Sequence, residues 1–145
     1  MEDNNSKIVL VTGTFNIMHP GHVRLLEFCS DFGKVVVGIN SDKYLNSKYG
    51  KDKTITLADR VFVLKSCKYV DSVVAFSEDE PTNLIKKIKP DFYVKGPDYK
   101  NKVIPEDKIL NLMGIKKIIQ PNKKEYSSSE LIKDVSLNDF TFFNN

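Results

Sequence analysis

The sequence predicts an α/β protein, a Rossmann-like, doubly wound parallel sheet of about five strands. Short β-rich runs alternate with helical stretches, and the links between them are short. The first run, Lys7–Thr12, is apolar throughout and stops at Gly13, which is typical of a strand buried on both faces. This alternation favours right-handed βαβ crossovers and a sheet covered by helices on both sides.

The remaining strands are expected where short runs of branched and aromatic residues recur between turn signals. These runs occupy Lys34–Ile39, Val70–Phe76, Phe92–Val94 and Ile115–Ile119.

The helices are predicted from apolar periodicity and from residues that start or stop a helix. The first follows His22, with Gly33 as its C-cap, and a second starts at the capping-box pattern Thr56-x-x-Asp59. Three more are expected, listed by their first or limiting residues: from Pro81 to before Pro90, over Pro105–Met113, and from Ser127 through Val135.

One stretch, Lys43 to Thr54, has no apolar periodicity and is rich in lysine and tyrosine. It follows the second predicted strand, where ligands of such sheets bind. We therefore expect an irregular, mobile flap over the site.

Composition is that of one globular domain. The 145 residues are 41% hydrophobic and carry a net charge of +3, so we expect a single domain over residues 1–145, with a core at about 7–135 and a polar, aromatic tail at 136–145. This charge favours neither nucleic acid nor a membrane surface as partner. The chain shows no membrane span and no secretory signal, and Cys29 and Cys67 lack metal-ligand spacing, so we expect a cytoplasmic protein with reduced thiols.

Ligands of doubly wound sheets bind at the carboxyl ends of the strands. Functional residues are therefore expected in four segments: Gly13–His22, Asn40–Asp42, Lys95–Tyr99 and Tyr126–Ser129.

The strongest single signal is the segment GTFNIMHPGH at residues 13–22, which holds both histidines of the chain. His19 and His22 fall near a helix N-terminus, where N–H groups favour an anion, and two imidazoles there can donate hydrogen bonds to phosphate. Gly21 would let a phosphate approach the backbone. The alternative is that the histidines only cap and pack the helix. No metal site is expected, because zinc would need a third Cys or His nearby.

This segment resembles the HxGH signature of the cytidylyltransferase-like nucleotidyltransferases, in the form GTFDxxHxGH. Further segments fit in order: Asn40–Asp42, KGPDY at 95–99 and SSSELI at 127–132. Within the family, the run from Asp71 to Tyr99 is most similar to the domain that adenylylates D-glycero-β-D-manno-heptose 1-phosphate.

The resemblance implies transfer of a nucleoside monophosphate, AMP from ATP, to a sugar 1-phosphate such as a heptose 1-phosphate, with release of pyrophosphate. Mg²⁺ would arrive with the nucleoside triphosphate. The expected partners are that triphosphate and a phosphorylated sugar or alcohol, not nucleic acid or a membrane, and the expected assembly is a homodimer.

The same resemblance assigns roles to individual residues. The catalytic residues would be His19, His22 and Lys48, with Lys51 and Lys53 as rivals of Lys48. Nucleotide would be bound by Gly13, Thr14, Phe15, His19, His22, Lys95, Gly96, Asp98, Ser127 and Ser128. The acceptor substrate would be bound by Asn16, Asp42 and Arg60.

Several of these residues have a plainer structural interpretation. Arg60 suits an ion pair with Asp59 or Asp71, Asp98 a turn cap, and Asp42 an Asx turn at the end of a strand. Asn16 stands where the family usually has Asp, which removes a charge from the acceptor side. Pro97 in place of the commoner Gly would stiffen its loop.

Other functions remain open at this stage. The first is a cytidylyltransferase that acts on glycerol phosphate or a related alcohol phosphate. The second is a non-catalytic nucleotide-binding module, although both histidines are present. A nucleic-acid binder ranks last, because the chain has only two arginines, Arg24 and Arg60.

Overall fold

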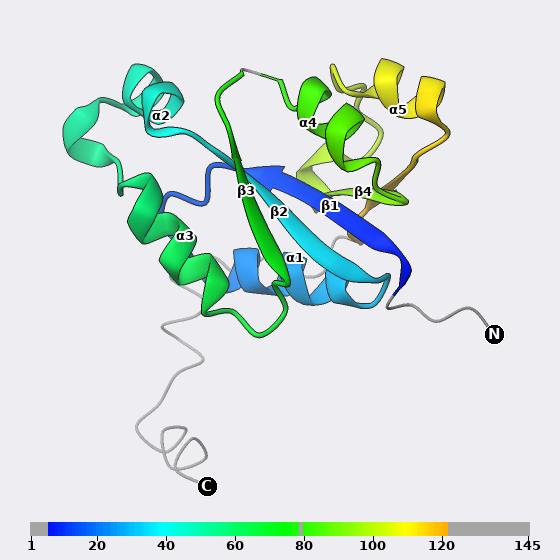
Figure 1. Ribbon diagram of the computed structural model, residues 1–145, viewed down its shortest axis with the longest axis horizontal. Helices are drawn as coiled ribbons and strands as arrows, with labels where there is room; N and C mark the ends of the chain where they lie inside the picture. The colour runs from blue at the N-terminus through cyan, green and yellow to red at the C-terminus, as the bar shows by residue number, and fades with distance from the viewer. Residues whose placement is uncertain (1–5, 79, 122–145) are drawn as a thin grey trace, which may run out of the picture.

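The computed structural model describes residues 6–78 and 80–121, which form a five-stranded, wholly parallel sheet in the order β3-β2-β1-β4-β5 (Figure 1). The strands are β1 Ile8–Gly13, β2 Lys34–Asn40, β3 Ser72–Phe76, β4 Phe92–Lys95 and β5 Lys116–Ile119. Strand order reverses beside β1, whose two neighbours are β2 and β4. The predicted Rossmann-like sheet is confirmed, with each strand within two residues of its expected bounds.

Helices cover both faces of the sheet. They are α1 Pro20–Ser30, α2 Asp42–Tyr49, the 3₁₀ turn η2 Lys51–Lys53, α3 Leu57–Lys65, α4 Thr82–Ile88, the 3₁₀ turn η3 Pro97–Tyr99 and α5 Asp107–Met113. Figure 1 shows α1 and α3 on one side of the sheet and α4 and α5 on the other, while α2 stands beyond the carboxyl end of β2. None of the described helices is long and apolar enough to cross a membrane.

The core has two layers because successive side chains of a strand point to opposite faces. In β1, Val9 and Val11 pack with Leu26 of α1 and Leu64 of α3, and all four are at most 1% exposed. Leu10 faces the other way, into a second cluster under α4 and α5. The unbroken apolar run of β1 follows from this two-sided burial.

Two aspartates close the edge of the sheet where the strands begin. Asp91, just before β4, accepts a hydrogen bond from the Ile8 N–H at 2.9 Å. Asp71, just before β3, does the same for Val35 at 2.7 Å. Asp71 is therefore not the ion-pair partner that the sequence suggested for Arg60.

The segment Lys43–Thr54, expected to be irregular, is mostly helical. It contains α2 and η2, anchored by Leu45, which is fully buried. Thr54 Oγ1 also donates to Asn46 Oδ1 at 2.7 Å, which folds the end of the segment back onto α2. One buried leucine and local polar bonds stabilise this short helix, and neither produces a long apolar stripe in the sequence. The expected mobility of the segment stays a prediction.

Gly33 does not cap α1 as expected, since the helix ends at Ser30 with Asp31 as its C-cap. Gly33 instead lies two residues further on, at φ +153°, where an added Cβ would come within 2.5 Å of the Lys7 carbonyl oxygen. Lys34 N–H donates to that same oxygen at 2.9 Å. Glycine is needed here because the chain turns into β2 directly against the start of β1.

We predict that Gly33→Ala lowers the free energy of unfolding by about 1–3 kcal/mol, because the new methyl group must displace backbone. The matched control is Gly96→Ala, since Gly96 has φ −69° and nothing within 4 Å of an added Cβ. Urea denaturation of the two variants measures the difference. Equal stabilities would contradict the close approach at Gly33.

Candidate active site

The turn from β1 into α1 brings the two histidines together through a reciprocal helix cap. His19 is the N-cap of α1, and its Nδ1 accepts from the Gly21 N–H at 3.1 Å. His19 N–H in turn donates to Nδ1 of His22 at 3.2 Å. The ring centroids lie 3.9 Å apart. The structural alternative raised by the sequence, that the histidines cap the helix, is therefore true.

Capping also determines which nitrogens remain for chemistry. Because both Nδ1 atoms accept hydrogen bonds, the proton of each neutral ring lies on Nε2. Burial, reinforced by the charge of His19, lowers the pKa of His22 to about 4. At neutral pH, His22 is therefore an uncharged ring with one N–H donor.

Gly21 is required by its neighbour. A Cβ at this position would lie 2.8 Å from Cε1 and 3.0 Å from Nδ1 of His19. The structure shows that this glycine makes room for the His19 ring. The approach of a phosphate to its backbone stays a prediction. Phe15, in the turn between β1 and α1, has φ +46° in the left-handed region. Its side chain is 3% exposed and packs in the core, which anchors this turn.

A cavity of about 370 Å³ opens at the carboxyl ends of the strands. Four residues expected in the site line it: Gly13, Thr14, Lys48 and Lys95. The rest of the lining comes from the strand ends, α2, the N-cap of α4, η3 and the segment before α5: Thr12, Asn40, Tyr44, Tyr49, Phe76, Pro81, Tyr99, Ile104, Pro105 and Glu106. The cavity thus lies at the strand ends where the sequence predicts ligand binding, and its occupation by a ligand stays a prediction.

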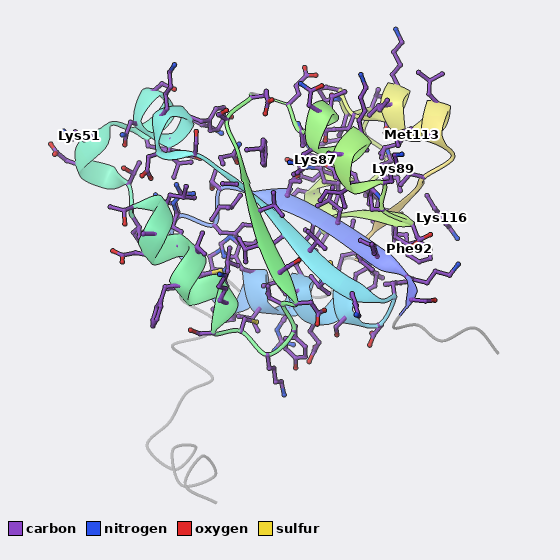
Figure 2. The ribbon with its side chains drawn as sticks, in the orientation of Figure 1. Lys51, Lys87, Lys89, Phe92, Met113 and Lys116 are labelled. Carbon is purple, nitrogen blue, oxygen red and sulfur yellow. The ribbon has the colours of Figure 1, made fainter. Side chains whose placement is uncertain are left out.

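Lys48 is the lysine of the α2 segment that lines this cavity. Its ammonium lies 5.2 Å from the centroid of the Tyr49 ring and 5.8 Å from that of Tyr44. Hydrogen bonding with Tyr49 is the main cause that raises the pKa of Lys48. Lys51 lies at the outer end of the segment and projects from the body of the protein (Figure 2). Lys48 thus lies in the cavity wall, and its contact with phosphate stays a prediction.

Lys95, at the end of β4, is held in a polar network that the sequence did not reveal. Its Nζ lies 3.8 Å from Oε2 of Glu106, whose side chain is 7% exposed. The same Oε2 accepts from the Tyr93 hydroxyl at 3.0 Å, and that hydroxyl lies 2.8 Å from Thr12 Oγ1. Burial lowers the pKa of Lys95, and the Glu106 carboxylate opposes this. Glu106 belongs to no motif and looks like an ordinary acid before a helix, so no sequence signal marked it.

Arg60 lies beneath the site and braces it. It is 1% exposed, and its Nε donates to the Ile55 carbonyl at 2.8 Å. Its NH1 donates to the Thr14 carbonyl at 3.0 Å and the Asn40 carbonyl at 2.7 Å, and NH2 pairs with Asp42 Oδ1 at 3.0 Å. One guanidinium therefore links the turns after β1 and β2 to the start of α3. Both side chains are thus engaged with protein, Arg60 as a donor and Asp42 as an acceptor. Substrate binding by either residue stays a prediction.

Asn16 belongs to the same assembly, because its Oδ1 accepts from the Ile55 N–H at 2.8 Å. An amide oxygen makes this contact as an Asp would, so the departure from the family pattern keeps a structural role. Asp98 is exposed on η3, and Gly96 just before η3 is half-buried. Neither residue lines the cavity. Ser127 and Ser128, with the last predicted helix and the tail, lie outside the described residues.

The histidines do not share the cavity of the two lysines. His19 is exposed and lines a separate cavity of about 550 Å³ with residues of α1 and with Tyr69. His22 is half-buried and lines neither cavity. Thr14 and Phe15 connect the two regions through the turn itself. Within residues 6–78 and 80–121, no cluster of three or more Cys, His, Asp or Glu suits a metal ion.

A doubly wound sheet with paired histidines at its first turn defines a nucleotide-binding α/β protein of the nucleotidyltransferase class. Residues 10–134 match a family model described as cytidylyltransferase-like. The chain therefore belongs to the cytidylyltransferase-like family, as its motifs predicted.

Known relatives agree. The bifunctional protein HldE of Sulfurimonas denitrificans is 41% identical over 105 residues, which are 71% of this chain and 22% of that protein. HldE of Campylobacter concisus is 38% identical over 141 residues, or 96% of this chain and 25% of that protein. The chain thus spans about a quarter of the length of these relatives.

Solved structures show the same fold. The crystal structure of the lipopolysaccharide core biosynthesis protein from Thermoplasma volcanium matches with a TM-score of 0.65 at 25% identity, over 82% of this chain and 98% of that one. Pantothenate synthetase from Thermus thermophilus shares the fold at a TM-score of 0.56 and 16% identity, over 95% of this chain and 65% of that one.

We predict that His19→Asn separates the capping of α1 from catalysis. Asparagine is a good N-cap and preserves stability, but it lacks the Nε2 donor, so turnover falls by roughly 10²-fold or more. His19→Ala loses turnover equally and also costs about 0.5–2 kcal/mol of stability. Steady-state kinetics and urea denaturation of both variants measure the two effects. Near wild-type turnover in His19→Asn would remove the donor role.

His22 makes stability depend on pH. Its folded pKa of about 4 lies below the unfolded value of 6.5, so the unfolded state takes up the proton first as pH falls. The stabilisation is complete above the unfolded pKa and is lost as pH falls towards the folded one. We predict that the stability difference between wild type and the non-titrating His22→Gln shrinks over this window. Parallel stability curves in urea would contradict it.

The contacts of Arg60 give a further prediction. Arg60→Met removes the guanidinium donor from three carbonyls and leaves Asp42 Oδ1 with only the Leu57 N–H, so we expect a loss of about 2–4 kcal/mol in the free energy of unfolding. Arg24→Met is the control, because Arg24 is the other arginine and is exposed on α1. Its expected change is below about 1 kcal/mol. Urea denaturation decides, and similar losses in both variants would show that the brace contributes little.

Proposed function

We propose that the chain transfers AMP from ATP to a sugar 1-phosphate, such as a heptose 1-phosphate, with release of pyrophosphate. The observation that carries this proposal is the reciprocal cap of His19 and His22, which leaves the Nε2–H of each ring without an acceptor among the described residues. Two preorganised donors at the N-terminus of an eleven-residue helix suit a polyphosphate.

The reaction needs no covalent enzyme intermediate. An ionised oxygen of the acceptor phosphate attacks the α-phosphorus of ATP in line, and the bond from that phosphorus to the bridging oxygen breaks. Pyrophosphate leaves with the bonding electron pair, and no proton has to be removed from the acceptor. The protein contributes position and charge stabilisation.

Individual residues share this work. His19 and His22 donate to phosphate oxygens as negative charge builds up. Neutral His22 carries its one proton on Nε2, because Nδ1 accepts the capping hydrogen bond. Gly13 and Thr14 line the adjoining cavity, and Lys48 brings a positive charge to its wall. Closure of the α2 segment over the phosphates remains part of the proposal.

Mg²⁺ belongs to the substrate in this scheme. Glu106 is the one carboxylate in the described cavity lining, and it is already engaged with Tyr93. These residues fit an ion held by phosphate oxygens and water better than one held by a carboxylate cage. When bound, the ion would neutralise phosphate charge.

The choice of ATP and a sugar 1-phosphate is supported by the Asp71–Tyr99 pattern. The alignments with the HldE relatives, which are 41% and 38% identical over the aligned residues, include this run. Pocket discrimination between adenine and cytosine need not exceed about 1–3 kcal/mol. The homodimer and the cytoplasmic location also remain proposals.

We predict pyrophosphate release with ATP and a sugar 1-phosphate, in the presence of Mg²⁺. The assay pairs ATP, CTP, GTP and UTP with a panel of sugar 1-phosphates and polyol phosphates, and His19→Asn provides the inactive control. A competition between ATP and CTP at equal concentration settles the nucleotide. Faster consumption of CTP with every acceptor would replace this assignment by the cytidylyl alternative, and no release with any pair would favour a non-catalytic module.

A further inference from the structure

A loose ion pair in the cavity wall points to a ligand group that the proposed function does not yet specify. Lys95 Nζ and Glu106 Oε2 are 3.8 Å apart, which is an ion pair but too long for a hydrogen bond. Both side chains are largely buried, at 13% and 7% exposed, and both line the 370 Å³ cavity. A buried pair held this loosely has hydrogen-bonding capacity left over.

The unused capacity can be assigned to atoms. Oε2 of Glu106 already accepts from the Tyr93 hydroxyl at 3.0 Å, whereas Oε1 accepts from no described residue. Among the described side chains, Ser41 Oγ is the single fully buried oxygen without a partner, so Oε1 must reach solvent. The solvent beside Glu106 is the cavity that it lines. Lys95 likewise has N–H groups beyond its ion pair, and Tyr99 positions them, with its ring centroid 4.5 Å from Nζ.

The network behind the pair keeps it in place. Thr12, Tyr93 and Glu106 form a chain of hydrogen bonds across β1, β4 and the start of α5. These hydrogen bonds hold the Glu106 carboxylate by Oε2 and leave Oε1 available to the cavity. A group that both donates and accepts would satisfy Oε1 and Nζ together, and a hydroxyl is the smallest group that does so.

We propose that Glu106 and Lys95 form a hydroxyl-binding subsite, in which Oε1 of Glu106 accepts from a ligand hydroxyl and Nζ of Lys95 donates to the same or a neighbouring one. The ligand is a sugar or polyol. This inference rests on the proposed function, which offers two sources of such hydroxyls, the acceptor sugar and the ribose of the nucleotide. Glu106 thereby becomes a specificity-determining residue.

The decisive test compares Glu106→Gln with Asp107→Asn by calorimetry. Gln keeps the shape of Glu106 without its charge. Asp107 is the adjacent acid, and it pairs with Lys117 at 2.7 Å without lining the cavity, which makes it a matched control. The probes are ATP against its 2′-deoxy and 3′-deoxy forms, and D-mannose 1-phosphate against its monodeoxy analogues. Binding is read without turnover, so an inactive wild type would refute the proposed function alone.

In one of the two arms, the wild type should bind the parent ligand about 10-fold or more tightly than one deoxy analogue, the scale of a lost hydrogen bond to a charged group. Glu106→Gln should discriminate less between the parent and that analogue, because a neutral amide is a weaker hydrogen-bond partner than a carboxylate, and Asp107→Asn should discriminate as the wild type does. The arm that responds identifies the source of the hydroxyl. Lys95→Met provides a second variant, expected to lose the same discrimination if Glu106→Gln is unstable. Unchanged discrimination in both arms, in either folded variant, would overturn the subsite.

Discussion

The arrangement of the site depends on a buried guanidinium. Arg60 satisfies backbone carbonyls from the turns after β1 and β2 and from the segment before α3, and it pairs with Asp42 at the start of α2. Carbonyl oxygens at strand ends lose their sheet partners, and burying them unpaired costs free energy. One planar group with five donors meets several of them at once. Arg60 therefore helps to fix the position of Thr14 and, together with the buried Leu45, that of α2, which carries Lys48.

The histidine motif shows structure and chemistry depending on the same atoms. Nδ1 of each ring is used to close the N-terminus of α1, and this fixes the tautomer that presents Nε2–H. Gly21 belongs to the motif because the His19 ring occupies the space of its Cβ. The pattern H-x-G-H is therefore a geometric unit, in which capping leaves Nε2 of each ring for the phosphate recognition that we propose.

The histidine motif is local in the chain, whereas the cavity lined by Lys48 and Lys95 is not. Its lining comes from elements far apart in the chain, including Thr12 of β1, Tyr99 of η3 and Glu106 before α5. The acidic member of its Lys95–Glu106 pair is invisible in the sequence, because a glutamate before a short helix has an ordinary local role. Its meaning arises when β4 places Tyr93 and Lys95 against it. Neighbours of this kind depend on strand order, which local patterns do not encode.

By itself, the sequence determined the fold class and the family. Apolar runs of strand length set the strand bounds, and the ten residues of GTFNIMHPGH carried the motif, since both kinds of signal are local in the chain. The tertiary structure decided the rest. It made Lys43–Thr54 mostly helical because Leu45 finds a buried position, and it directed Arg60 to Asp42 instead of Asp59 or Asp71. It also joined Glu106 to Lys95. Each of these outcomes depends on contacts between residues distant in sequence, whose energies exist only once the sheet has brought the elements together.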